Sequence, residues 1–291
     1  MNNNKIWSLI DHRQDDVVIV STIKSGTTWV QQIVSQLIFK GEKNPNLSDT
    51  SLWIDNLREH DQNTILNTIE HQTHRRFFKT HSPANIVLNP ISKKVKYIFI
   101  TRDFRDVVWS FFNHFTKSKY PLGDPKKKQV EKQLRESISP HEFWKIIIEN
   151  KYKFSKCNEY NIIWSYFNTV NSWFNAAKNN NNILLIHFND LKHDLLGNVK
   201  KISKFLDFDY SSDTFHLIKS RCTFEYMKQN GRKCVPKHFH NISTTFINKG
   251  INKRWFDCFT EEDYSEYNNL LDMFFKNDVK EWSQSGKLLK I

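Results

Sequence analysis

Short apolar runs recur along the chain and predict the strands of one sheet. Residues 17–20, 97–100 and 183–188 are stretches rich in β-branched, leucine or phenylalanine side chains, as in strands buried on both faces. A shorter run at 76–80 predicts a further strand. We therefore expect a central parallel sheet of about four to five strands.

Between these runs, the apolar residues adopt the spacing of helices. After the first run they fall on one helix face, at positions 29, 30, 33, 34, 37 and 38. Helical stretches also follow the second run at 107–115, precede the third at 162–177 and follow it at 199–206. Strands that alternate with helices imply a parallel sheet covered on both faces, which is an α/β fold.

The segment 118–142 interrupts this alternation. It is polar and rich in lysine, and Pro121, Gly123, Pro125 and Pro140 punctuate it. It predicts an exposed excursion inside a domain, since no internal repeat or low-complexity linker divides the chain. We expect a single domain over residues 1–291.

The net charge indicates which kind of partner the protein binds, and the cysteine content indicates the redox state of its compartment. The 43 Lys and Arg residues exceed the 31 Asp and Glu residues, which gives a net charge of +12 and indicates an anionic partner. Nucleic acid, an acidic membrane surface and a phosphorylated small molecule all fit this charge. No apolar run approaches the ~18 residues of a membrane span, and the first residues lack the apolar core of a signal peptide. Four cysteines without a Cys-x-x-Cys pair favour a reducing cytoplasm.

The loop between the first strand and its helix carries the clearest chemical signal. A helix N-terminus offers unpaired backbone N–H groups and the positive end of the helix dipole. A glycine lets the backbone curl close to an anion, and a lysine adds a charge. The loop predicts a phosphate cradle and consists of Lys24, Ser25, Gly26, Thr27, Thr28 and Trp29. The alternative is a helix that is merely capped by a serine or threonine.

Five segments together resemble one enzyme family. They are 23–29 (IKSGTTW), 79–81 (KTH), 101–110 (TRDFRDVVWS), 222–227 (CTFEYM) and 246–250 (FINKG), the last followed by Trp255 and by Phe259 and Thr260. In this order and spacing they are similar to the motifs of the cytosolic sulfotransferases, which transfer sulfuryl groups from 3′-phosphoadenosine 5′-phosphosulfate (PAPS). The resemblance implies the sulfotransferase fold with its P-loop-like nucleotide site.

The resemblance assigns PAPS to three groups of residues. Lys24 to Thr28 would hold its 5′ end, and Trp29, Phe188 and Phe224 would lie at its base. The 3′-phosphate would contact Arg102, Ser110, Lys249 and Gly250. Arg102 and Ser110 suit this role independently, because a guanidinium offers a planar fork of donors and the hydroxyl follows about two helical turns later. A salt bridge at the sheet edge is the alternative for Arg102, and core packing is the alternative for Trp29.

The resemblance also assigns the catalytic groups. His81 would act as general base on the acceptor, while Lys24 and Lys79 would stabilise charge on the sulfuryl and departing phosphate oxygens. A sulfuryl group carries less negative charge than a phosphoryl group, so we expect protein cations to suffice without a metal. The alternative for a single histidine is a structural role.

Three features of the sequence depart from the family pattern. Asn248 stands where the family has arginine, with Lys253 and Arg254 as candidate substitutes, and Phe188 replaces a tyrosine. The family's C-terminal dimerisation motif survives only as Thr260, with Phe256 and Glu261 at positions where the motif has other residues. We therefore expect a monomer or a weak dimer.

Aromatic residues near the expected site suggest the acceptor's chemistry. The candidate acceptor residues are Phe78, His81, Phe112, His114, Trp164 and Tyr166. They favour a small soluble acceptor with a flat or ring-shaped body, such as a phenol or a natural product. The acceptor atom is a hydroxyl oxygen or an amine nitrogen, because a histidine can take a proton from either.

Other classes of function match fewer residues. A P-loop-like nucleotide kinase lacks its Gly-Lys-Ser/Thr, and a nucleic-acid-binding protein lacks a recognition motif. A zinc site from Cys222, Cys234, His238 and His240 has no standard spacing. We expect no nucleic acid, membrane or metal partner.

Overall fold

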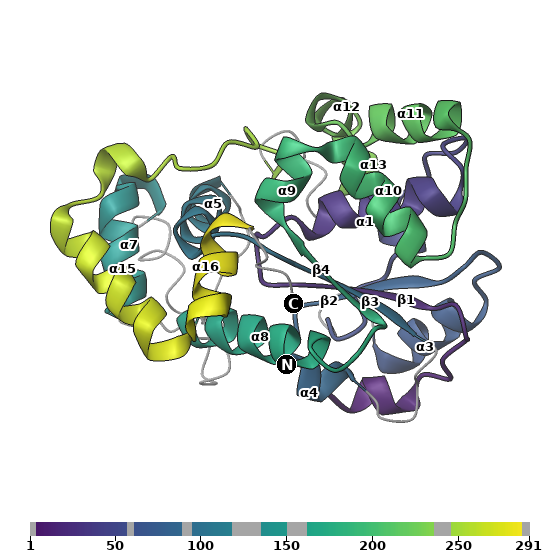
Figure 1. Cartoon of the computed structure of the whole chain (residues 1–291), viewed down its shortest axis with the longest axis horizontal. Coiled ribbons are helices and arrows are strands. Elements are labelled where there is room, and N and C mark those ends of the chain that lie inside the picture. The colour runs from purple at the N-terminus through teal and green to yellow at the C-terminus, as the bar shows by residue number, and fades with distance from the viewer. Residues whose placement is uncertain are drawn as a thin grey trace.

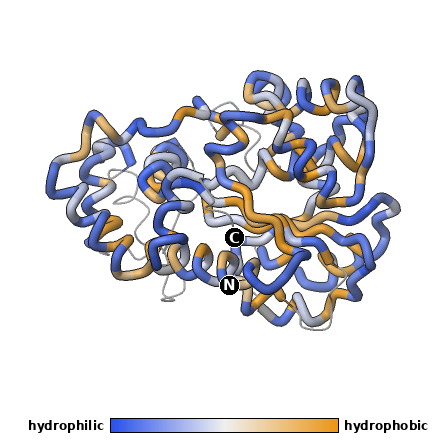
Figure 2. The backbone as a smooth tube through the Cα atoms, viewed as in Figure 1, coloured by the Kyte–Doolittle hydropathy of each residue, from blue (hydrophilic) through white to orange (hydrophobic). Residues whose placement is uncertain are grey.

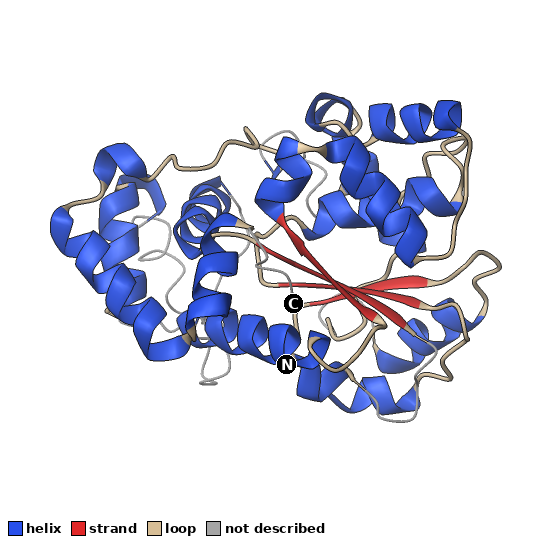
Figure 3. Cartoon of the chain, in the orientation of Figure 1, coloured by secondary structure: helices blue, strands red, loops and turns tan. Residues whose placement is uncertain are grey.

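Four parallel strands form the centre of the molecule (Figures 1 and 3). A computed structural model describes residues 4–56, 61–88, 95–117, 135–149, 162–235 and 246–286. Its strands are β1 (Val17–Ser21), β2 (Phe77–Thr80), β3 (Lys96–Thr101) and β4 (Ile183–His187), in the order β2-β1-β3-β4. The α/β prediction is confirmed, and β1 pairs with both β2 and β3.

Alternate side chains of β1 enter two separate hydrophobic clusters. Val18 and Val20 belong to one cluster, and Val17 and Ile19 belong to the other. Every residue of β1 is buried, because helices cover both faces of the sheet. Figure 2 shows the strands as the hydrophobic centre of the chain.

Different helices cover the two faces. On the face of Val17 and Ile19 lie α1 (Thr27–Ile38), α10 (Leu195–Phe205) and α11 (Ser212–Arg221). The cluster of Val18 and Val20 includes residues of α3 (Gln62–Glu70), α4 (Ala84–Val87), α5 (Phe104–Lys117), α8 (Ile162–Ala177) and α16 (Asn277–Ser285). In Figure 1, α1, α10 and α11 lie above the sheet, α3, α4 and α8 lie below it, and α5 and α16 lie beside it at the left.

Other helices lie outside these two sets. They are η1 (Asn4–Leu9), α2 (Leu47–Thr50), α7 (Pro140–Ile148), α9 (Phe188–His193), α12 (Phe224–Gln229), α13 (Gly231–Cys234), η5 (Phe256–Cys258) and α15 (Glu261–Phe274). None of the described helices is both long and apolar enough to cross a bilayer.

Two sequence predictions need adjustment. The run at 183–188 is one residue shorter as a strand, because Phe188 already begins α9. Most of the predicted excursion at 118–142, residues 118–134, lies outside the described residues. Its last three residues belong to a helix, since Pro140 opens α7 and Ser139 caps it in a capping box with Glu142.

The strand directions decide where the functional residues meet. Parallel strands end at one edge of the sheet, and ligands of such folds bind outside these carboxyl ends. Lys24 follows β1, His81 follows β2, Arg102 follows β3 and Phe188 follows β4. The sheet therefore brings four segments that are far apart in the sequence to one edge.

Candidate functional site

The loop after β1 has a backbone shape that requires glycine. Gly26 has φ +107°, and a Cβ atom there would lie 2.9 Å from Cδ2 of Phe188. Lys24 also adopts a positive φ of 59°. Gly26 is the N-cap of α1, and no side-chain hydrogen bond caps the helix. The alternative of a helix capped by serine or threonine therefore does not describe this loop, whose helix N-terminus keeps its anion-binding character.

Hydroxyl groups hold the loop in this shape. Ser21 hydrogen-bonds Thr27, and Thr22 hydrogen-bonds Ser25, in both cases between side-chain oxygens. Ser25 and Thr27 are buried, whereas Thr28 is half-buried in the first turn of α1. The loop is thus organised by its own side chains.

Cations from three strands converge beside this loop. Burial, together with the charges of Arg102 and Lys79, lowers the pKa of Lys24 to about 7. Its Nζ lies 4.2 Å from the centre of the Phe246 ring. Lys79 is 9% exposed, and its Nζ lies 4.7 Å from the centre of the Trp53 ring. An anion placed among these groups would relieve their mutual repulsion.

His81 is held in one tautomer. Its Nδ1 lies 2.9 Å from the carbonyl oxygen of Ser21, which can only accept, so Nδ1 carries the proton and Nε2 keeps a lone pair. Burial and the charge of Lys79 lower the pKa of His81 to about 4, against the opposing effects of Ser21 and Asp55. The imidazole is therefore a neutral base at physiological pH.

A segment that sequence analysis missed supports these catalytic candidates. Lys79 donates its backbone N–H to the carbonyl of Leu52 at 2.9 Å, which brings Trp53 and Asp55 to the end of β2. The Trp53 ring meets His81 edge-on at 4.9 Å between ring centres. Asp55 is 1% exposed and accepts hydrogen bonds from the hydroxyls of Thr80 and Ser82, both at 2.5 Å.

The neighbours of His81 are thus fixed by a buried carboxylate. In the sequence, the only indication of this carboxylate is that the acidic Asp55 follows the apolar Leu52 and Ile54. That signal does not indicate which strand the segment joins.

Arg102 lies at the end of β3 against an aromatic ring. Its guanidinium carbon is 4.3 Å from the centre of the Phe188 ring. Its Nη2 donates to the side chain of Asn252 at 2.5 Å and to the carbonyl of Ile251 at 3.1 Å. Asp106 is 3.9 Å away, which is the ion pair that the alternative for Arg102 anticipated, although at a long distance.

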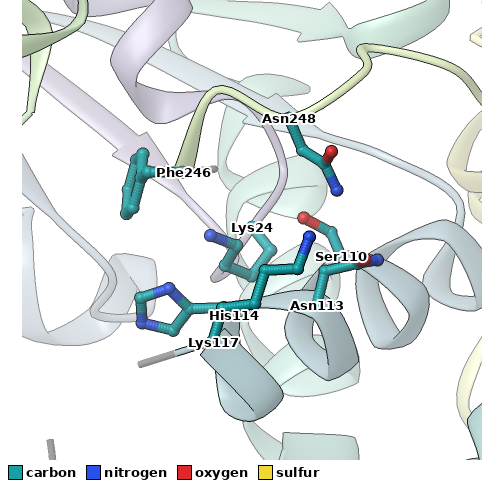
Figure 4. Close-up of a pocket in the computed structure, with 7 residues that line it drawn as sticks. All are labelled: Lys24, Ser110, Asn113, His114, Lys117, Phe246 and Asn248. Atoms are coloured by element: carbon teal, nitrogen blue, oxygen red, sulfur yellow. The ribbon is translucent and has the colours of Figure 1, made fainter. Parts of the chain in front are cut away.

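A small cavity lies between α5 and the loop that carries Phe246 and Asn248 (Figure 4). Its lining comes from three distant segments of the chain. The lining residues are Lys24, Ser110, Asn113, His114, Lys117, Phe246 and Asn248. In Figure 4 the side chains of Ser110 and Asn248 point toward one another. The structure therefore brings Lys24, Ser110 and position 248 to one place.

Lys249 and Gly250 continue this loop. Lys249 is exposed. Gly250 has φ +61°, and a Cβ atom there would lie 2.8 Å from Cδ2 of Phe224. Glycine at 250 thus allows the loop to approach the ring of Phe224.

Two of the three candidate base-binding aromatics touch each other. Trp29 meets Phe188 edge-on with ring centres 5.3 Å apart, and its Nε1 donates to the carbonyl of Cys222 at 2.7 Å. Phe224 follows that cysteine by two residues and contacts the Gly250 loop. Trp29 is half-buried, so part of it remains open beside the loop.

The candidate acceptor residues are not all placed at this site. Phe78 is completely buried in the core, and Tyr166 is 2% exposed with its hydroxyl donating to the carbonyl of Arg102 at 2.8 Å. Tyr166 therefore fixes the end of β3. Phe112 packs against Phe143, whereas His114 lines the cavity and meets Phe246 edge-on at 5.6 Å. The side chain of Trp164 lies outside the described part of the chain.

The zinc alternative receives no support from the described residues. Cys222 and Cys234 are buried, and no group of three or more metal-ligating side chains occurs in the described ranges. His238 and His240 lie outside these ranges.

Comparison with known proteins identifies relatives of this chain. A family model described as a sulfotransferase domain matches residues 14–283. The chain is 28% identical to amine sulfotransferase of Oryctolagus cuniculus over 284 residues, covering 93% of this chain and 82% of that protein. It is 24% identical to a glycolipid sulfotransferase of Mycobacterium tuberculosis over 308 residues, covering 99% of this chain and 93% of that protein.

Solved structures share the fold. Mouse sulfotransferase SULT7A1 complexed with PAP matches with a TM-score of 0.72 at 22% identity, covering 95% of this chain and 90% of that one. Retinol dehydratase in a complex with retinol and PAP matches with a TM-score of 0.67 at 22% identity, covering 94% of this chain and 84% of that one.

Proposed function

The chain belongs to the sulfotransferase family, and we propose that it transfers a sulfuryl group from PAPS to a hydroxyl or amine nitrogen of a small acceptor. One observation carries this proposal: Lys24, Lys79 and the neutral His81 meet at the carboxyl edge of the sheet, beside a helix N-terminus. The family assignment argues against the kinase and nucleic-acid-binding alternatives.

The described residues fit the parts of PAPS. The curled loop from Lys24 to Thr28 suits the 5′-phosphosulfate, because Gly26 leaves room that a Cβ atom would fill. Arg102, Ser110, Lys249 and Gly250 are our proposed contacts of the 3′-phosphate. Trp29, Phe188 and Phe224 are the proposed neighbours of the base. Two structural relatives, mouse SULT7A1 and retinol dehydratase, bind PAP in their crystal structures, which supports this choice of nucleotide.

The same residues suggest how the transfer proceeds. Nε2 of His81 takes the proton of the acceptor while the acceptor atom bonds to sulfur and the bond from sulfur to the phosphate oxygen breaks. The carbonyl of Ser21 holds Nδ1 and so keeps Nε2 available as the base. Lys24 and Lys79 stabilise the negative charge on the sulfuryl oxygens and the departing oxygen. The products are the sulfated acceptor and PAP.

We propose that the acceptor is a small molecule with a hydroxyl or an amine group. The names of the relatives include an amine and a glycolipid sulfotransferase, and a neutral imidazole can deprotonate a hydroxyl or an amine. His114 and Trp53 lie beside the cationic cluster and are our candidates for contact with a ring-shaped acceptor.

We further propose a monomer or weak dimer in a reducing compartment. Thr260 is the one residue retained from the family's dimerisation motif, and it serves as the N-cap of α15. Among the described residues, Cys222, Cys234 and Cys258 are free thiols, as a reducing environment allows. Light scattering on the purified protein measures the oligomeric state.

A transfer assay tests the proposed function. The protein is incubated with sulfur-labelled PAPS and a panel of phenols, steroids, amines and alkaloids, and label in an acceptor is expected. The His81→Ala variant is the matched control and should transfer almost none. Thermal stabilisation by ATP but not by PAP, with no labelled acceptor, would refute the proposal.

A further inference from the structure

A second guanidinium lies close to Arg102 and has no ion pair with an acidic side chain in the part of the chain that the structure describes. Burial chiefly lowers the pKa of Arg102, and the charge of Arg254 lowers it further, so the two guanidiniums are close enough to repel each other. The guanidinium carbon of Arg254 lies 5.3 Å from the centre of the Trp109 ring. Trp109 directly precedes Ser110, which lines the cavity shown in Figure 4.

The residues on both sides of Arg254 are anchored to one carboxylate, Lys253 through its backbone and Trp255 through its indole. Asp106 accepts a hydrogen bond from the backbone N–H of Lys253 at 2.7 Å and from Nε1 of Trp255 at 3.1 Å. Asp106 also lies 3.9 Å from Arg102. These bonds fix the segment that carries Arg254 against the start of α5, close to Arg102.

The carboxylates of this region do not balance its cations. Asp103 is engaged by Arg105 at 2.6 Å. Asp106 is shared between Arg102, the backbone N–H of Lys253 and the indole of Trp255. Within the described ranges, no ion pair to an aspartate or glutamate occurs for Arg254. Two guanidiniums beside one shared carboxylate favour the binding of a dianion such as a phosphate monoester.

Position 248 cannot supply this charge. Asn248 faces Ser110 in the cavity but is neutral, and the side chain of Lys253 is exposed. We propose that Arg254 provides the second cationic contact of the 3′-phosphate, together with Arg102 and Ser110. This inference rests on the proposed PAPS-dependent function and names the residue that takes over the role of the arginine missing at 248.

A comparison of two nucleotides tests this role. PAP and AMP differ by the 3′-phosphate, so a residue that contacts this group affects only PAP. Arg254→Ala should weaken PAP binding by about 10- to 100-fold, the effect of removing a hydrogen-bonded charged partner, and leave AMP binding unchanged. Both affinities are measured by calorimetry, and weak binding is measured by displacement of one nucleotide by the other. The ionic strength is kept constant because salt screens charges.

Two further variants make the test specific. Lys253→Ala removes a neighbouring exposed charge and should leave PAP affinity nearly unchanged. Adding Asn248→Arg to Arg254→Ala should restore PAP affinity, because it places a cation beside Ser110 in the cavity that position 248 lines. The melting temperature without nucleotide shows whether each variant is folded.

The contradicting outcomes are distinct. An equal loss of PAP and AMP affinity in Arg254→Ala, or an equal loss of PAP affinity in Lys253→Ala, would overturn the assignment of Arg254. Wild-type protein that binds PAP no better than AMP would instead overturn the proposed use of PAPS.

Discussion

The two ends of the parallel sheet use buried charges in opposite ways. At the amino end, Asp16 and Arg76 precede neighbouring strands, and each is at most 1% exposed. Their side chains form two bonds of 2.8 and 2.6 Å. At the carboxyl end, Lys24, Lys79 and Arg102 approach one another, and Arg102 reaches Asp106 only at 3.9 Å.

The pKa values reflect this difference. Burial alone would raise the pKa of Asp16, but hydrogen bonds from His12 and Arg76 and the charge of Arg76 lower it overall. At the other end, burial, Arg102 and Lys79 all lower the pKa of Lys24, to about 7. Paired charges stabilise the fold, whereas the accumulated cations are stabilised when an anion arrives. The charges at the amino end therefore have a structural role, and those at the carboxyl end are suited to binding an anionic ligand.

The largest effect is expected at the carboxyl end, on the rate of transfer. His81→Ala should lower kcat by about 10²- to 10⁴-fold, the usual contribution of a general base. PAP affinity should remain nearly intact, because the base acts on the acceptor. Steady-state kinetics with calorimetric PAP binding measures both quantities. Full activity of the variant would remove His81 from the mechanism.

The opposite pattern is expected at the amino end. Arg76→Ala leaves Asp16 as a buried charge with a weaker set of partners, which should cost about 3–5 kcal/mol of the free energy of unfolding. Denaturant unfolding measures this loss. PAP affinity of the folded fraction should not change, since Arg76 lies at the far end of β2 from His81. Weaker PAP binding by this variant would contradict the division of roles between the two ends.

Arg102 gives the matched substitution at the carboxyl end. Arg102→Ala should weaken PAP binding by about 2–4 kcal/mol, because charge-assisted bonds from its planar fork are lost. The free energy of unfolding should fall by less than in Arg76→Ala, since the bonds of Arg102 go to neutral groups of the C-terminal loop. Unchanged PAP affinity would exclude Arg102 from the nucleotide site.

The sequence predicted the strands and the loop because their signals are local. An apolar run followed by Lys24 to Trp29 specifies a strand, an anion-binding turn and a helix without reference to the rest of the chain. The placement of Asp55 depends instead on the pairing of Leu52 with Lys79, two residues that are separated by a stretch of chain that includes α3. No local pattern encodes that contact, so the support of His81 was missed.

Tyr166 is a second case in which a local sequence pattern did not indicate a long-range contact. Its place on an aromatic helix suggested an acceptor contact, yet its hydroxyl reaches the carbonyl of Arg102. The periodicity of α8 determines which residues share a face. It does not determine whether that face meets a ligand or the end of a strand.

The smallest effect is expected from pH. The pKa of His81 is about 4 and that of Lys24 is about 7 in the protein without nucleotide. The value of kcat/KM for PAPS should therefore rise as His81 loses its proton near pH 4 and fall as Lys24 loses its proton above about pH 7. Lys24→Arg should abolish the alkaline decline, because arginine stays charged. An alkaline decline that persists in this variant would assign it to another group.

The central claim, that the cations at the carboxyl edge form an anion site, is tested most directly by the protons that accompany PAP binding. At pH 8 most of Lys24 is neutral, because its pKa is about 7, while phosphate groups with a second pKa of about 6 are already ionised. Calorimetric titration in buffers of different ionisation enthalpy measures the proton exchange. The account predicts that the wild-type protein takes up close to one proton on binding PAP and that Lys24→Arg takes up almost none. Binding without proton uptake by the wild type, or the same uptake by both proteins, would contradict it.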